Sequence, residues 1–182
     1  MQLTAYKIVV TAVALWAKSG AFEPEPPFQA VGEMSGADSQ IESPRVVLVQ
    51  DQSTWAAVWK DHRQATALAA PGVQNPVSNV DDRPRVDFQK YTVLCMFGGQ
   101  SKNVAGFTLA EAVDHDGTAY VRIRPQVLSA GGLGLLQNAY MMLVLPRTKR
   151  KMIVQLDQTQ LGGEGWRTLA TFGPTIQEKT KF

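Results

Sequence analysis

The fold is decided by one stretch of the chain, Tyr91-Thr-Val-Leu-Cys-Met-Phe-Gly-Gly99. Its apolar and β-branched residues run on without polar alternation, and a pair of glycines closes the run. A run of this kind predicts a strand that is buried on both faces. Because such a strand needs a covering layer on each side, we expect the remaining elements to pack around it.

Composition places this strand in an ordinary globular domain. The chain has 182 residues, which fits one domain with flexible ends and is long enough to form a core. Hydrophobic residues make up 45% and charged residues 19%, so the chain as a whole is not expected to be disordered. The formal net charge is only +2, which argues against a surface built for nucleic acid.

Cysteine and histidine are too scarce for the common metal sites. Cys95 is the single cysteine, so an intrachain disulfide is excluded, and His62 and His115 are the only histidines. A cysteine-rich zinc site is therefore excluded as well. We expect Cys95 to be a small, inert, buried thiol in its strand, and we predict neither a metal nor another cofactor.

The first residues have the layout of a secretory signal peptide. Lys7 precedes an apolar run from Ile8 to Ala17, and small residues follow at 19–21. The run is too short for a stable membrane span, which needs about 20 apolar residues. We expect residues 1–21 to direct export of the protein from the cytoplasm; the alternative is an N-terminal helix or strand of the fold.

The flanks of the domain are rich in residues that break regular structure. Proline, glycine, serine and glutamate predict an extended linker over residues 22–44. We expect the domain to cover residues 45–157. Several glycines and a proline predict a loosely packed tail over residues 158–182, with three apolar side chains docked on the domain: Trp166, Leu169 and Phe172.

A helix is predicted from Thr54 to about Leu68 by the spacing of its apolar residues. Asp51 and Ser53 provide the residue types that favour a helix start. Four residues at helical spacing share one face and require a large apolar surface to cover them: Trp55, Val58, Trp59 and His62. We expect His62 to be a packed histidine and not a ligand, because the chain offers it few ligand partners.

The second half of the chain predicts an antiparallel run of strands. Asp116-Gly117 between two alternating segments indicates a tight hairpin turn. In the return strand, Val121 and Ile123 are predicted to face one side, and Tyr120, Arg122 and Arg124 the other. We expect a hairpin joining the strand Ala139–Leu145 to Met152–Leu156 through the basic turn at 147–151.

These elements predict an α+β domain that is mainly antiparallel β. We expect a curved meander sheet of about five to six strands with one amphipathic helix packed on it. No catalytic residue is predicted, because neither histidine lies near a nucleophile-elbow pattern; an enzyme acting through His62 or His115 is the alternative.

Two segments are candidate partner-binding surfaces. The apolar glycine-rich loop contributes Gly131, Leu133, Leu135 and Leu136. The basic turn contributes Arg147, Lys149, Arg150 and Lys151, for which a solvated hairpin tip is the alternative. A small anionic-ligand domain that uses Arg122, Arg124 and the 147–151 turn remains a second functional hypothesis.

The order of landmarks over roughly residues 40–157 resembles the PrcB C-terminal domain family, which includes subunits of bacterial protease complexes. The matching features are Ser53-Thr-Trp55-Ala-Ala-Val-Trp59, Val86-Asp87-Phe88, the strand end at Gly98, the strand start at Gly106-Phe107, Pro125, and the strand Tyr140–Pro146. The sequence departs from the family at Ala139, where a proline commonly precedes the tyrosine, and in the longer loop at 128–137.

The resemblance implies an extracytoplasmic, non-catalytic module similar to an accessory subunit of a surface protease. The implied partner is a protein, and an envelope protease in particular. The matched motif residues are expected to be structural, and Asp87 is expected to accept backbone hydrogen bonds where the chain enters the central strand.

Overall fold

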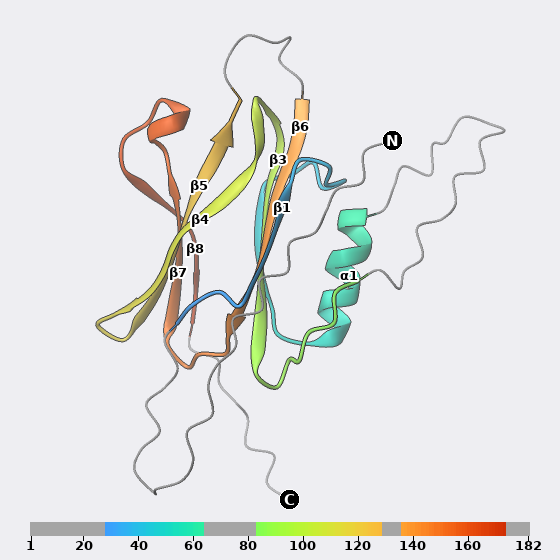
Figure 1. Ribbon diagram of the computed structural model, residues 1–182, viewed down its shortest axis with the longest axis vertical. Coiled ribbons are helices and arrows are strands. Elements are labelled where there is room, and N and C mark those ends of the chain that lie inside the picture. Colours follow the sequence, from blue (N-terminus) through green and yellow to red (C-terminus); the bar gives the residue numbers. More distant parts are fainter. Residues whose placement is uncertain (1–27, 64–82, 129–135, 174–182) are drawn as a thin grey trace, which may run out of the picture.

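The structure, a computed structural model, describes residues 28–63, 83–128 and 136–173. Within these residues, eight strands form two four-stranded sheets, and one α-helix lies against the first sheet (Figure 1). In chain order the elements are β1 (Gly32–Gly36), β2 (Arg45–Val49), α1 (Gln52–Arg63), β3 (Tyr91–Lys102), β4 (Val104–His115), β5 (Thr118–Val127), β6 (Leu136–Pro146), β7 (Lys151–Asp157), the 3₁₀ helix η2 (Thr159–Leu161) and β8 (Trp166–Phe172).

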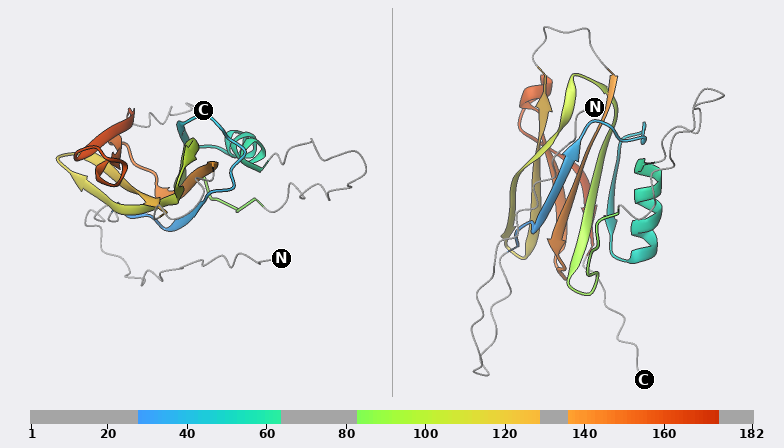
Figure 2. Two further views of the ribbon diagram at one scale, coloured as in Figure 1. Left: turned by 90° about the horizontal axis from the view of Figure 1, so that it is seen from above. Right: turned by 45° about the vertical axis from the view of Figure 1, so that its right-hand side comes forward.

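The elements form three layers (Figure 2). The first sheet has the order β1-β6-β3-β2 and is antiparallel throughout. The second sheet has the order β4-β5-β7-β8, and its central pair, β5 and β7, is parallel. The second sheet packs on one face of the first sheet, and α1 packs on the other face.

Strand β3 is buried on both faces, as its sequence predicts. Leu94 and Met96 belong to the core between the two sheets. Val93, Cys95 and Phe97 belong to the core between the first sheet and α1. Burial raises the pKa of the Cys95 thiol to about 12, so this cysteine stays protonated at neutral pH.

Helix α1 turns its predicted apolar face to the first sheet. Trp55, Val58, Trp59 and His62 are all buried. The helix begins at Asp51, whose carboxylate accepts hydrogen bonds from the Ser53 hydroxyl and from the Thr54 backbone N–H, the latter at 2.8 Å. These bonds, that of Ser53 first, lower the pKa of Asp51 to about 2. The predicted extension of the helix to Leu68 lies outside the described residues.

The prediction of a single meander sheet is wrong, although the mainly antiparallel β content and the single helix are confirmed. Strand β6 pairs with β1 and β3 in the first sheet, whereas β7 pairs with β5 and β8 in the second sheet. The basic turn at 147–151 is therefore a crossing between the sheets and not a hairpin tip. Apolar runs show that β6 is buried, but they do not show which strand lies beside it.

Both predicted flanking segments contribute strands. Gly32–Gly36, within the expected linker, forms β1 at the edge of the first sheet, and Phe28 and Ile41 are buried. Trp166–Phe172, within the expected loose tail, forms β8 and pairs with β7. Leu169 and Phe172 pack against the inter-sheet core, which confirms their predicted docking. The sequence does not predict β1, because Gly-Glu-Met-Ser-Gly lacks a strand-like pattern.

Two of the motif glycines lie where strands approach each other closely. A Cβ at Gly98 would lie 2.9 Å from the ring of Phe107. A Cβ at Gly106 would lie 2.9 Å from the hydroxyl of Ser35. That hydroxyl donates to the Phe107 carbonyl at 2.7 Å and accepts from the Phe107 N–H at 2.9 Å, so it joins β1 to β4 across the two sheets.

The remaining motif residues make contacts within the fold. The Asp87 carboxylate accepts the Gln89 N–H at 3.0 Å where the chain enters β3, which confirms its expected role. Phe88 packs against the helix core, Pro125 lies opposite Phe107 in β5, and Pro146 lies opposite Tyr91 at the end of β6.

We expect Gly99→Ala to destabilise the fold by more than about 2 kcal/mol. Gly99 has φ +68°, and a Cβ there would lie 2.6 Å from the Glu42 carbonyl oxygen, in the segment that connects β1 to β2. Gly117→Ala is the control, because it has φ +70° but no atom within 4 Å of the added Cβ. The stability lost in Gly117→Ala therefore measures the backbone strain alone, which is about 1–2 kcal/mol. Urea unfolding measures both variants, and equal losses would refute the close approach at Gly99.

Candidate interaction surface

Exposed apolar side chains gather at one end of the molecule. Among the described residues, the large hydrophobic side chains that are exposed are Val31, Val127, Leu128, Leu136 and Leu161. The last four lie where β5 ends, β6 begins and η2 packs against β5 (Figure 1). Val127, Leu128, Leu136 and Leu161 are called the apolar end below.

The turn between β3 and β4 holds three of these residues together. Asn103, with φ 63°, makes this turn, and its carbonyl accepts the Leu128 N–H at 2.8 Å. Val127 lies opposite Val104 on one side of the turn. Leu136 lies opposite Lys102 on the other side and is 57% exposed, the highest value of the set.

Asp157 holds Leu161, the fourth residue of the apolar end, in place. Its Oδ1 accepts the Thr159 hydroxyl at 2.7 Å and the Thr159 N–H at 3.0 Å, which anchors η2 and thereby Leu161. Its Oδ2 accepts Nε of Arg124 at 3.2 Å. These interactions, the Thr159 hydroxyl first, lower the pKa of Asp157 below its ordinary value.

The predicted glycine-rich contact loop is only partly described. Gly131, Leu133 and Leu135 lie outside the described residues. Leu128 and Leu136, the described residues on either side of this segment, both belong to the apolar end.

The outer face of the second sheet carries a stack of arginine and aromatic side chains. Tyr120, Arg122 and Arg124 face outward, as predicted, while Val121 and Ile123 are buried. The Arg122 guanidinium carbon lies 5.6 Å from the ring centre of Tyr120 and 5.4 Å from that of Trp166. Such cation–π stacking fixes the guanidinium and ties β8 to β5 across β7. Within the described part of the chain, no element covers this face (Figure 2).

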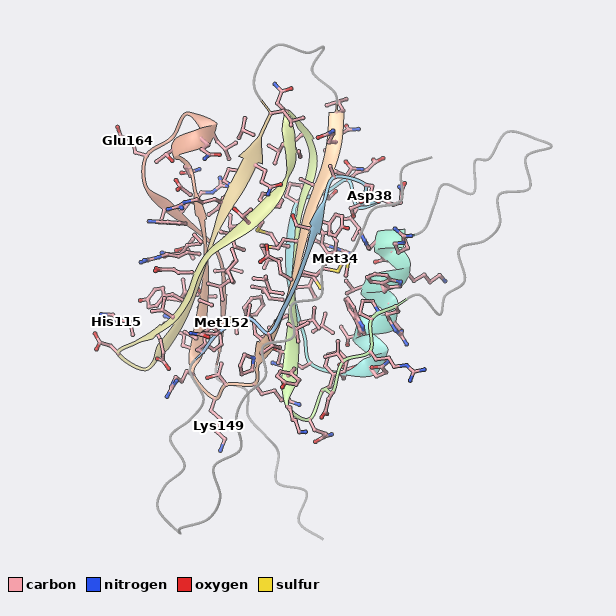
Figure 3. The ribbon with its side chains drawn as sticks, viewed as in Figure 1. Met34, Asp38, His115, Lys149, Met152 and Glu164 are labelled. Atoms are coloured by element: carbon pink, nitrogen blue, oxygen red, sulfur yellow. The ribbon has the colours of Figure 1, made fainter. Side chains whose placement is uncertain are left out.

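The basic residues of the 147–151 segment do not form one patch with Arg122 and Arg124. Lys149 lies at the end of the molecule opposite Glu164 in η2–β8 (Figure 3). Lys151 lies opposite Thr118, four residues before Arg122, which corresponds to about 13 Å along β5. Lys149 and Lys151 therefore lie toward one end of the second sheet, and Arg122 and Arg124 lie toward the other end.

Two of the four cations of this segment serve the fold. Arg147 donates from its guanidinium to the Phe88 carbonyl and from its backbone to the Lys90 carbonyl, so it fastens β6 to the start of β3. Arg150 pairs with Asp114 of β4. Lys149 and Lys151 are exposed and have no partner in the part of the chain that the structure describes.

The histidines form no accessible catalytic centre. His62 Nδ1 lies 3.1 Å from the Ser39 hydroxyl, but both side chains are 1% exposed between α1 and the first sheet. A substrate could reach this serine–histidine pair only if the helix moved away. His115 is exposed beside Asp116 at the β4–β5 hairpin (Figure 3). No cluster of metal-ligating side chains is found among the residues described.

Trp166 lies on the outer face with Arg122 and Arg124, whereas the sequence predicts only that it docks on the domain. Its neighbours Gly162, Gly163 and Gly165 suggest a loose segment, and this obscures the strand that follows. The only local feature that favours a strand here is the alternation of side chains in Trp166-Arg-Thr-Leu, which places Trp166 and Thr168 on the same face.

We expect Asp157→Asn to lower the melting temperature at neutral pH and to reduce its dependence on acid. The pKa of Asp157 is lowered in the folded state, so its carboxylate stabilises the fold above about pH 4 and loses this effect as the pH falls through the lowered value. The difference in melting temperature between wild type and variant should hold from about pH 7 to 5 and shrink below about pH 4. Asp116→Asn, at an exposed turn, is the control. A difference in melting temperature that stays the same below about pH 4 would contradict the stabilising role of the ionised Asp157 carboxylate.

Comparison with known proteins identifies no relative. No protein-family model matches the chain, and no curated protein and no solved structure is significantly similar to it. The resemblance to the PrcB C-terminal domain family therefore rests on the sequence landmarks alone. In the described residues, no helix is long and apolar enough to cross a membrane.

Proposed function

We propose that this protein is a non-catalytic protein-binding module of the bacterial envelope and that its apolar end is the partner-binding surface. The observation that carries the proposal is the gathering of Val127, Leu128, Leu136 and Leu161 at one end of the fold. Single exposed apolar residues are common on proteins, but a group of them marks a contact site more often.

The surroundings of the apolar end have the composition of a binding hot spot. Arg124 and Trp166 lie on the adjoining outer face, linked to η2 through Asp157. Arginine and tryptophan are enriched among the residues that contribute most to protein binding, and apolar side chains beside them exclude water from the contact. Strand pairing and the Asp157 hydrogen bonds fix the backbone of these residues, so binding would cost little ordering.

The location and partner class come from the sequence. The signal-peptide layout of residues 1–21 supports export, and the family resemblance supports an accessory role beside an envelope protease. The anionic-ligand hypothesis has less support, because Arg122, Arg150 and Arg147 have internal partners and the remaining cations are spread over two ends of the sheet.

We expect the double variant Leu128→Ser, Leu136→Ser to bind its partner at least about tenfold more weakly than wild type. Covering one leucine side chain is worth about 1.5–3 kcal/mol, and both leucines are exposed in the free chain, so the fold should remain intact. Val31→Ser is the matched control: Val31 is 47% exposed and its N–H bonds to Val144, toward the other end of β6.

Quantitative affinity capture from the envelope fraction of the native host, with the three proteins in parallel, makes the measurement. The same prey should be retained by wild type and the control and lost with the double variant, and the mature N-terminus of the bait reports export. Equal capture by all three proteins would refute the assigned surface. An intact Met1 on a cytoplasmic bait would refute the location.

A further inference from the structure

Two arginines on the same strand face are held in different ways. Arg122 is engaged on both edges, with Nε donating to Gln155 at 2.9 Å and Nη1 paired with Glu111. Arg124 is engaged only through Nε, which donates to Asp157 at 3.2 Å. No described residue accepts a hydrogen bond from the terminal nitrogens of Arg124, so this guanidinium keeps a free edge with parallel N–H donors.

The two side chains of the Arg124–Asp157 pair differ in how far they are exposed. The Asp157 side chain is 12% exposed, whereas the Arg124 side chain is 53% exposed. Both carboxylate oxygens of Asp157 already accept hydrogen bonds, from Arg124 and from Thr159. A partner that approaches this point therefore meets the guanidinium and not the carboxylate, so the accessible charge is positive.

The orientation of Arg124 is fixed before any partner binds. The Asp157 carboxylate holds one edge of the guanidinium, and its carbon lies 6.0 Å from the ring centre of Trp166. Arginine with one edge held and a ring nearby is suited to bind a carboxylate through two parallel hydrogen bonds. Because the side chain is already ordered, less conformational entropy is lost on binding.

The apolar end lies at a distance that one peptide segment can span. Asp157 links Arg124 to one residue of this end, because its Oδ2 accepts from Arg124 and its Oδ1 accepts from Thr159, two residues before Leu161. Leu161 lies in η2, which Asp157 anchors. An acidic side chain on Arg124 and an apolar side chain on Leu161 therefore fit a single extended or helical segment.

We propose that the partner segment carries an aspartate or glutamate whose carboxylate binds the free edge of Arg124, beside apolar side chains that cover the apolar end. Arg124 would be the residue that selects an acidic–apolar segment, and Asp157 would be a positioning residue acting through it. This inference rests on the proposed function, because it names the kind of segment that the same surface takes.

Selection from a random peptide display library tests the preference without a known partner. The full chain without residues 1–21, as wild type, Arg124→Gln and Arg167→Gln, would be used in parallel. Arg167 is the matched control, because it is exposed on β8 beside Trp166 and has no partner among the described residues. Wild type and the control should enrich peptides with an acidic residue at a fixed spacing from leucine, isoleucine or phenylalanine, and Arg124→Gln should lose the acidic preference.

A synthetic peptide from the wild-type selection then supports a double-mutant cycle. Replacing its acidic residue by the corresponding amide should weaken binding to wild type at least about tenfold and leave binding to Arg124→Gln unchanged. Asp157→Asn should reduce the preference for the acidic over the amide peptide more than it reduces binding of the amide peptide. Amidating the peptide's own C-terminus should change nothing, since the carboxylate belongs to a side chain.

The outcomes separate this inference from the proposed function. Apolar peptides without an acidic preference, lost with Leu128→Ser, Leu136→Ser, would overturn the role of Arg124 and leave the binding surface standing. Acidic peptides that bind Arg124→Gln as well as wild type would overturn it too, as would an affinity that depends on the terminal carboxylate. A wild-type selection without any enriched peptide would count against the acidic–apolar segment, while the capture experiment still decides on the surface.

Discussion

The constraint on which the structure depends is that the first sheet is apolar on both faces. Strands β3 and β6 lie at its centre, and each contributes buried side chains to two separate cores. Neither face can be left to water, since each large side chain left exposed would cost about 1.5–3 kcal/mol. The second sheet covers one face and the two tryptophans of α1 cover the other, which explains why so large an apolar stripe is placed on such a short helix.

The covering layers decide which surfaces are left for contacts. Because α1 and the second sheet are both committed to the first sheet, their own outer sides and the ends of the strands remain. The outer face of the second sheet is held by cation–π contacts and ion pairs, and Val113 and Ile153 lie on this face opposite Tyr120. Among the described residues, large apolar side chains are exposed chiefly at the strand ends beside η2, so the apolar end and this network lie next to each other and share Asp157.

Sequence patterns predict the features that depend on residues close together in the chain. The two-faced strand at Val93–Phe97, the buried stripe of Trp55 and Trp59, and the Asp116-Gly117 turn are all present. The patterns fail where pairing joins distant residues: they predict a linker at β1, a tail at β8 and a hairpin of β6 with β7, whereas β1 pairs with β6 and β8 with β7. In the same way Arg124 and Asp157 were each visible in the sequence, but their hydrogen bond, across 33 residues and two parallel strands, follows from the crossing of β6 and not from any local spacing.

The position of β1 has a consequence for how the chain acquires its structure. The carbonyl of Tyr140 lies 3.0 Å from the Ser35 hydroxyl although it is 105 residues further along the chain, and all of β1 pairs with β6. The first strand of the domain therefore has no partner strand until β6 has been synthesised. Such non-local topology slows folding, and a ribosome releases only about 5–20 residues per second. During synthesis β1 therefore stays unpaired while about a hundred further residues are added, so its pairing is a late step of folding.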